Sequence, residues 1–203
     1  MQIFAQAYAL GGEARIVGGA VRDWLAGYPV SDIDMAINLP IETVASHMVA
    51  CDMRVVETGL KHGTITLYDN DDQIELTQTR VDLETDGRHA IVAHDQDWAR
   101  DAARRDFTIN ALYLDKSGGI FDPLDGRADL QAGRLCFAGD AGLRVQEDAL
   151  RMIRYCRFLP RFAATGIDPH AQTALRKHAS LCAGLSGERI ANEMRRIMVG
   201  GGL

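Results

Sequence analysis

The stretch Gly18-Gly19-Ala20-Val21-Arg22-Asp23, followed by Asp32-Ile33-Asp34, decides how the rest of this chain is interpreted. The pattern around it predicts a short strand at Ala14–Val17 and a helix at Ala20–Ala26. Gly18 and Gly19 stand at the junction, where a backbone without side chains lets amide groups approach a phosphate. Arg22, in the first helical turn, adds a planar guanidinium that suits phosphate oxygens. This half of the stretch therefore predicts a phosphate-binding turn.

The second half places two carboxylates on one face of a strand predicted at Asp32–Asn38. Because side chains alternate along a strand, Asp32 and Asp34 lie on the same side. Neighbouring carboxylates repel each other unless a cation lies between them, and Mg²⁺ prefers such oxygen ligands. The same spacing recurs at Asp95-Gln96-Asp97 in a predicted loop, so the spacing alone is weak. Together with the glycine turn, it predicts a magnesium-dependent nucleotide site with Asp32 and Asp34 as catalytic metal ligands.

A third carboxylate belongs to the run Gln73–Thr77, which is predicted to be a strand. Glu75 shares a face with Thr77 rather than with the apolar residues of that run. It could complete the metal site or accept the proton of an attacking hydroxyl group. Glu75 could equally be a solvated strand residue, and the sequence leaves both interpretations open.

The composition is that of a globular chain of one or two domains. Its 203 residues are 47% hydrophobic, enough to bury a core. No run is long enough to span a membrane and no signal-peptide pattern is visible, so we expect no membrane partner and a cytoplasmic location. The four cysteines are scattered, which favours buried thiols over disulfides or zinc.

The net charge of −6 is unusual for a protein that binds a long nucleic acid. Arginines nevertheless cluster at 100–105 and again at 144–161. Such clusters suit a nucleotide better than a long duplex. We therefore expect most of any polynucleotide-binding surface to lie outside this chain.

The order of the predicted elements indicates an α+β domain followed by a helical one. After the first strand–helix–strand unit, the pattern predicts a helix at Ile41–Ala50, strands at Met53–Glu57, Gly63–Tyr68 and Gln73–Thr79, a mobile loop at Asp82–Asp97, a helix at Trp98–Arg105, a strand at Thr108–Leu114, and helices at Leu143–Phe162, Pro169–Ala179 and Glu188–Met198. The change of pattern near Ala138 predicts domains at residues 1–137 and 138–203.

The first of these later helices carries a second polar group. At about 100° per residue, Asp148, Arg151 and Arg154 gather on one side of a continuous helix, and Arg157 lies further round. A carboxylate can accept from the exocyclic amine of cytosine or adenine while a guanidinium donates to the neighbouring ring nitrogen. Guanine and uracil present the opposite order and would leave groups unpaired. The pair Asp148 and Arg151 is therefore predicted to select C and A, the alternative being a surface ion pair of little consequence.

A third polar group is Arg104-Arg105-Asp106-Phe107-Thr108-Ile109-Asn110. Arg105 could contact a phosphate and Asp106 could accept a hydrogen bond from a ribose hydroxyl group, whereas Phe107 and Ile109 are predicted to be core residues. A helix end capped by the polar residues is the alternative.

In this order, these residues resemble the class II tRNA nucleotidyltransferases and bacterial poly(A) polymerases, within the polymerase-beta-like nucleotidyltransferases. The resemblance covers nearly the whole chain and is carried by the motifs at 18–23, 32–34, 104–110, 147–151 and 187–190. It implies a head domain with a mixed five-stranded sheet and an all-helical neck that selects the nucleotide. It further implies that Gly19 and Arg22 hold triphosphate, that Arg105 binds the nucleotide and that Arg154 and Arg157 clamp it.

The resemblance also implies the reaction, which is magnesium-dependent transfer of CMP or AMP from CTP or ATP to an RNA 3′ end. We expect CCA addition to tRNA, because Leu60–Thr64 and the Asp82–Asp97 segment resemble that group. Poly(A) synthesis is the alternative, followed by a small-molecule nucleotidyltransferase or an inactive nucleotide-binding module. Members of the family usually continue into helical body and tail domains that grip tRNA, and we expect those domains to be absent here. The oligomeric state is left open.

Overall fold

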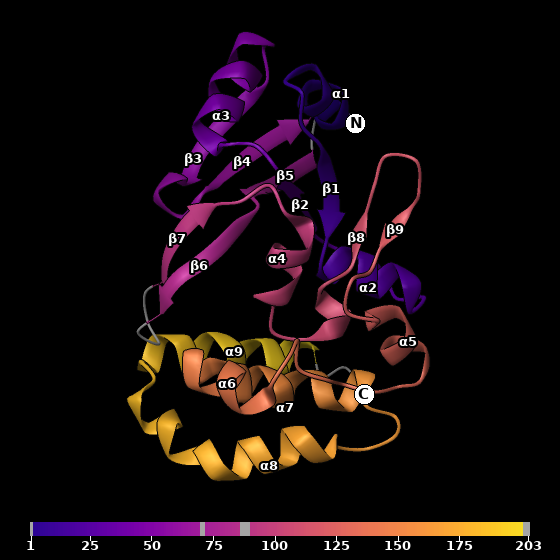
Figure 1. Cartoon of the computed structure of the whole chain (residues 1–203), viewed down its shortest axis with the longest axis vertical. Helices are drawn as coiled ribbons and strands as arrows, with labels where there is room; N and C mark the ends of the chain where they lie inside the picture. The colour runs from indigo at the N-terminus through magenta and orange to yellow at the C-terminus, as the bar shows by residue number, and fades with distance from the viewer. Residues whose placement is uncertain (1, 70–71, 86–89, 201–203) are drawn as a thin grey trace.

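The computed structural model describes residues 2–69, 72–85 and 90–200. A mixed β-sheet with its covering helices lies at one end of the long axis, and a layer of helices lies at the other (Figure 1). The elements of the first part are α1 (Gln2–Ala9), β1 (Ala14–Val17), α2 (Gly19–Leu25), β2 (Ile33–Ile37), α3 (Ile41–Ala50), β3 (Arg54–Gly59), η1 (Leu60–His62), β4 (Thr64–Asp69), β5 (Asp72–Gln78), β6 (Arg80–Thr85), β7 (Ala90–His94), α4 (Trp98–Ala103), η2 (Thr108–Asn110), β8 (Tyr113–Leu114), β9 (Ile120–Phe121) and α5 (Gly126–Gln131). The helical layer comprises α6 (Ala141–Glu147), α7 (Leu150–Phe162), α8 (Pro169–His178), η3 (Ala179–Gly184) and α9 (Gly187–Gly200).

The large sheet has the strand order β3-β4-β5-β2-β1-β8-β9. Strands β2 and β5 run parallel, and the other neighbouring pairs are antiparallel. The expected α+β fold with a mixed sheet is confirmed. The sheet has seven strands rather than the expected five, because the two-residue strands β8 and β9 extend it beyond β1.

Alternation along β2 and β5 separates an apolar face from a polar one. Met35, Ile37, Ile74 and Leu76 are buried in the core that α1 and α3 cover. The residues that alternate with them along the strands, which include Asp34 and Glu75, point to the opposite face. The same pattern that builds the core therefore presents the carboxylates on the other side of the sheet.

The segment predicted to be a mobile loop, Asp82–Asp97, is not a loop over most of its described length. It contributes to the two-stranded antiparallel sheet of β6 and β7, in which Arg80 is opposite His94 and Val81 is opposite Ala93. Residues 86–89 lie outside the described residues. The prediction was wrong because pairing of the two segments satisfies their backbone groups without the strong apolar alternation on which a strand prediction depends.

The predicted helix Leu143–Phe162 is two helices. Asp148 ends α6 with φ −153° and ψ 105°, an extended conformation. Its carboxylate accepts a hydrogen bond from the backbone amide of Leu150 at 3.0 Å, which caps the next helix. The chain therefore turns at Asp148, and the continuous helical face that grouped Asp148 with Arg151 does not exist.

The predicted strand Thr108–Leu114 is mostly a turn. Thr108–Asn110 forms the 3₁₀ turn η2, and only Tyr113–Leu114 pairs as a strand. Gly126, the first residue of α5, packs on this turn so closely that a Cβ atom there would lie 2.1 Å from the carbonyl oxygen of Thr108. Close packing by α5 thus accompanies the turn where a strand was predicted.

Aromatic rings join the two parts of the molecule. Phe107 is fully buried, as predicted for a core residue, and its ring contacts Phe137, Tyr155 and Phe158 at centroid distances of 5.2–5.8 Å. The core cluster around it takes residues from both sides of the predicted boundary near Ala138. The division at 137/138 stays a prediction, and the two sides share one apolar core.

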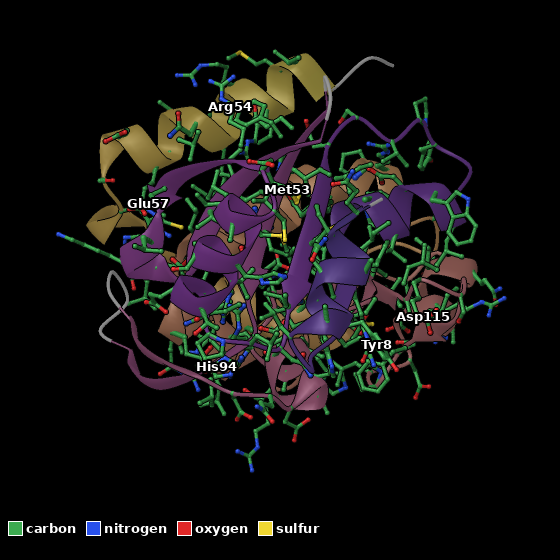
Figure 2. The ribbon with its side chains drawn as sticks, turned by 90° about the horizontal axis from the view of Figure 1, so that it is seen from above. Tyr8, Met53, Arg54, Glu57, His94 and Asp115 are labelled. Carbon is green, nitrogen blue, oxygen red and sulfur yellow. The ribbon has the colours of Figure 1, made fainter. Side chains whose placement is uncertain are left out.

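Tyr8 of α1 and Asp115 of the β8–β9 turn lie on the same side of the molecule (Figure 2), and Lys116 Nζ is 4.7 Å from the centre of the Tyr8 ring.

The cysteines are exposed or partly exposed rather than buried as predicted. Over the described ranges, no helix combines the length and apolar character needed to cross a membrane.

Candidate active site

Two cavities meet at the polar face of the sheet. The larger, of about 1280 Å³, is lined by α2, the start of β2, β5, α7 and α9. The smaller, of about 220 Å³, is lined by the sheet face and by α4. Asp34, Glu75 and Arg105 line both, so these three side chains stand where the cavities adjoin.

The carboxylates form the floor of the larger cavity. Asp34 lies directly opposite Glu75 in the parallel register of β2 and β5, and Asp32 comes two residues earlier beside the same cavity. The surrounding walls partly remove Asp34 from water and raise the pKa of its carboxyl group, and neighbouring Asp32 raises it further. The pKa of Glu75 is raised by partial burial and then by Asp34. All three carboxylates line the larger cavity, and their catalytic roles, including the one left open for Glu75, stay predictions.

A divalent cation fits this donor set. The neighbouring carboxylates destabilise one another as anions, and a cation between them would relieve that repulsion. Among the described residues, no group of three or more His, Cys, Asp and Glu side chains is placed as a complete ligand set. Mg²⁺ binds through one or two carboxylates with water and substrate phosphate completing its shell, so a pair such as Asp32 and Asp34 is sufficient.

The glycine turn differs in detail from the expectation. Gly18 has φ +66°, a conformation that glycine adopts readily, and its amide donates to the Leu112 carbonyl oxygen at 3.1 Å. That amide is therefore occupied within the protein. Gly19 is the first residue of α2, where amides lack partners within the helix, and it lines the larger cavity.

Arg22 is held rigidly where α2 meets α7. Its Nε and Nη2 atoms donate to the two carboxylate oxygens of Asp23, both at 2.9 Å, and Nη1 donates to Asn110 Oδ1. The guanidinium lies 4.8 and 4.7 Å from the ring centres of Phe158 and Phe162. Only 7% of Arg22 is exposed, so it is an oriented cation in the wall of the cavity.

Arg105, just after α4, is fixed by a buried carboxylate of that helix. Asp101, on α4, is 1% exposed and accepts from Arg105 Nη2 at 3.2 Å, from Arg104 Nε at 2.9 Å and from the Tyr113 hydroxyl group at 2.7 Å. Burial works against the charged form of Arg105, but Tyr113 and Asp101 outweigh it and raise the pKa of the guanidinium. Arg105 therefore presents a permanent positive charge to both cavities.

Asp106 links the sheet domain to the helices. It accepts from Arg154 Nε at 2.8 Å, from Asn110 Nδ2 at 3.0 Å and from the Phe107 amide at 2.9 Å. Burial alone would raise the pKa of Asp106, but Arg154 and these hydrogen bonds outweigh it and hold the pKa below its ordinary value. Its oxygens are thus engaged with the protein; the side chain also lines the larger cavity, and its contact with a ribose hydroxyl group stays a prediction.

A surplus of positive charge surrounds Glu193 of α9. This carboxylate is 4% exposed and lies 3.4 Å from Arg154 Nη1, 2.8 Å from Arg157 Nε and 3.7 Å from Arg196 Nη1. Burial, and then the repulsion of neighbouring arginines, lower the pKa of Arg157 despite the opposing effect of Glu193. Arg154 is also paired with Asp106, so two carboxylates face three guanidinium groups and this wall of the cavity still favours an anion.

Asp148 and Arg151 lie outside both cavities. Asp148 accepts from Arg189 Nη2 at 2.8 Å, which ties α9 to the junction of α6 and α7. Arg151 donates to Glu147 Oε2 at 2.6 Å and to the Arg104 carbonyl oxygen at 3.1 Å. The structure does not pair Asp148 with Arg151. It pairs Asp148 with Arg189 instead.

The sequence interpretation missed several residues of the site. Asp101 precedes Arg104 and Arg105 by three and four positions, a helical spacing that could have revealed it. Asn110 stood inside a quoted motif without a role. Helix α9 contributes Asn192, Glu193, Arg195 and Arg196 to the site. Nothing in the local sequence indicates this role, because the position of these residues depends on how α9 crosses α7.

The comparisons with known proteins agree with this geometry. The chain belongs to the family described as "Poly A polymerase head domain", whose model matches residues 14–136. It is 44% identical over 191 residues to the mitochondrial CCA tRNA nucleotidyltransferase 1 of Danio rerio, covering 93% of this chain and 44% of that protein. The chain thus spans less than half the length of this relative.

Solved structures show the same fold. The Bacillus stearothermophilus CCA-adding enzyme in complex with CTP matches with a TM-score of 0.87 and 33% identity, over 96% of this chain and 46% of that one. A tRNA nucleotidyltransferase complexed with a primer tRNA and an incoming ATP analog matches with a TM-score of 0.76 and 25% identity, over 95% of this chain and 55% of that one.

Proposed function

We propose that this chain is the catalytic head and nucleotide-selecting neck of a CCA-adding tRNA nucleotidyltransferase. It would transfer CMP and AMP from CTP and ATP to the 3′-hydroxyl group of tRNA. The observation that carries this proposal is the larger cavity. There the carboxylates at β2 and β5 face an arginine-rich wall, which is formed by arginines of α2, α7 and α9. The names of the relatives, one bound to CTP and one to a primer tRNA with an ATP analog, support the same substrates.

The basic wall and the acidic floor of the larger cavity have different roles in the proposed reaction. Arg22, Arg105 and Arg157 would bind and orient the triphosphate, each as a cation already held in place. The bond from the RNA 3′-oxygen to the α-phosphorus forms as the bond to pyrophosphate breaks, and pyrophosphate leaves with the bonding electrons. The proton of the hydroxyl group would pass to Glu75, whose raised pKa suits a proton acceptor.

We propose Mg²⁺ as the cofactor, held by Asp32 and Asp34. When bound, it supplies charge neutralisation for the triphosphate and for the attacking oxygen. The support for this assignment is the raised pKa of Asp34, which is caused by partial burial and then by the neighbouring carboxylate of Asp32.

Selection of the base is proposed to involve Asp148 and Arg151, after release of their present partners. Asp148 would exchange Arg189, and Arg151 would exchange Glu147, for the Watson–Crick edge of cytosine or adenine. Substitution Asp148→Ala should then reduce the preference for C and A over G and U. Unchanged discrimination in that variant would refute the assignment.

Poly(A) synthesis is the second candidate, since the matching family is described by that activity. The experiment offers tRNA lacking CCA, and separately an oligoadenylate, together with each labelled nucleoside triphosphate. Additions of C, C and A that stop at three support CCA addition, whereas long adenylate tails support the second candidate. Absence of transfer to any RNA would refute both. A cytoplasmic location stays a prediction, and the Danio rerio relative is by its name mitochondrial.

A further inference from the structure

The smaller cavity lies on the side of Asp34 and Glu75 that faces away from the arginine-rich wall. Along β2 and β5, Asp32 and Gln73 line the larger cavity, whereas Ala36 and Thr77 line the smaller one. Asp34 and Glu75 come between them in sequence and line both. The strands therefore pass from the larger cavity, through the carboxylates, to the smaller cavity.

A pair of hydroxyl groups occupies the wall of this smaller cavity. Thr64 of β4 and Thr77 of β5 are directly opposite each other in the antiparallel register, and their Oγ1 atoms are 3.0 Å apart. One hydroxyl group donates to the other, which leaves one hydrogen and free lone pairs for a further partner. The pair can therefore donate one hydrogen bond and accept another at the same place.

The geometry of phosphoryl transfer indicates what enters there. The attacking and leaving oxygens lie roughly in line on opposite sides of the phosphorus. With the triphosphate against the arginines, the acceptor must approach from the other side of Asp34 and Glu75. The smaller cavity is on that side.

Size and charge narrow the occupant further. Ordinary pockets for whole ligands measure roughly 300–1,000 Å³. A cavity of about 220 Å³ is smaller and suits part of a larger molecule. Arg80, Arg104 and Arg105 also line it, but so do Asp34, Glu75 and Asp101, and this balanced lining suits a neutral ribose better than a phosphate group.

We propose that the Thr64–Thr77 hydroxyl pair binds the 2′-hydroxyl group of the 3′-terminal ribose of the RNA acceptor. A 2′-hydroxyl group both donates and accepts, which matches the pair. The contact places the neighbouring 3′-hydroxyl group at Asp34 and Glu75, so Thr64 and Thr77 are positioning residues that select an RNA end over a DNA end. This inference rests on the proposed function, because it requires an RNA acceptor.

The test compares two acceptors in one enzyme. The tRNA lacking CCA ends either in a ribose or in a 2′-deoxyribose, and kcat/KM is measured for CMP transfer to each. Loss of one net hydrogen bond predicts a kcat/KM about 3- to 10-fold lower for the deoxy acceptor with the unmodified enzyme. Equal use of both acceptors would overturn the inference while leaving the proposed function intact. Absence of transfer to either would remove both.

Variants of Thr64 and Thr77 test whether this hydroxyl pair causes the discrimination between the ribose and the deoxyribose acceptor. Thr77→Val should lower kcat/KM for the ribose acceptor by the same factor, with almost no loss for the deoxy acceptor, and Thr77→Ser should restore it. Thr64→Val tests the pair from the other strand and serves if Thr77→Val misfolds. Thr173→Val, on exposed α8, is the matched control. An equal loss on both acceptors, or weaker binding of CTP in calorimetry, would contradict the role of the pair.

Discussion

The floor and the wall of the larger cavity carry opposite charges, and they differ more in how those charges are balanced. At the acidic floor, partial burial and then a neighbouring carboxylate raise the pKa of both Asp34 and Glu75. In the basic wall, buried carboxylates hold the arginines, as Asp106 and Glu193 hold Arg154. The floor thus depends on a ligand for its balance, whereas the wall is largely preorganised. This difference predicts that substitutions in the floor affect chemistry and that substitutions in the wall affect folding first.

The largest expected effect is on catalysis at the floor. Asp34→Asn should reduce transfer of CMP by about 1,000-fold or more, because it removes a proposed ligand of the magnesium ion that neutralises the triphosphate. Single-turnover rates at saturating CTP measure the effect. Asp125→Asn is the control, since Asp125 is exposed and has φ +55°, a conformation that asparagine also adopts. Full activity in Asp34→Asn would disprove the metal assignment.

In the wall, the largest effect should be on stability. Asp106→Ala should lower the free energy of unfolding by about 2–4 kcal/mol, because it leaves Arg154 largely buried without its main partner. Urea unfolding followed by circular dichroism measures the change. Arg100→Ala removes an exposed pair with Asp95 and should be indistinguishable from the unmodified chain. An equal cost for the two substitutions would show that the wall is not preorganised as described.

A smaller effect is expected where the wall is only partly balanced. Arg157→Ala should weaken CTP binding by about tenfold, the loss of one charge-assisted contact. Calorimetry at two salt concentrations would show a weaker salt dependence in the variant. Arg176→Ala on α8 is the control, being exposed and outside both cavities. Unaltered CTP affinity in Arg157→Ala would place the triphosphate elsewhere.

The smallest effect concerns pH and the floor in the absence of metal. A carboxyl group whose pKa is raised by folding destabilises the fold once it ionises, so this cost appears as the pH rises through the raised pKa. Asp34→Asn should therefore stabilise the chain at pH 7 by less than about 1 kcal/mol, given its solvent access, and the gain should vanish near pH 3. Thermal melts in a chelator at both pH values measure it. A gain that is the same at both would mean that charge is not its cause.

The sequence was sufficient for the parts of the site that depend on local pattern. The alternation that buries Met35 and Leu76 also sets Asp34 and Glu75 on the other face, and the parallel pairing of β2 with β5 aligns them. The break at Asp148 could not be predicted from apolar periodicity. It depends on the extended backbone of Asp148 and on the hydrogen bond that its carboxylate accepts from the Leu150 amide. Glu193 was missed because its partners are 36 and 39 positions away or on its own helix, and only the packing of α9 on α7 assembles them.

Gly126 lines neither cavity, yet the site depends on its lack of a side chain. Any Cβ atom there would collide with the backbone of Thr108, two residues before Asn110. Asn110 contacts both Arg22 and Asp106, so a displaced turn would disturb the cation and the carboxylate together. If every position were substituted in turn, residue 126 should therefore accept as few side chains as a residue that touches the substrate. Its variants should lose activity as active-site variants do, although Gly126 lies on the opposite side of the turn.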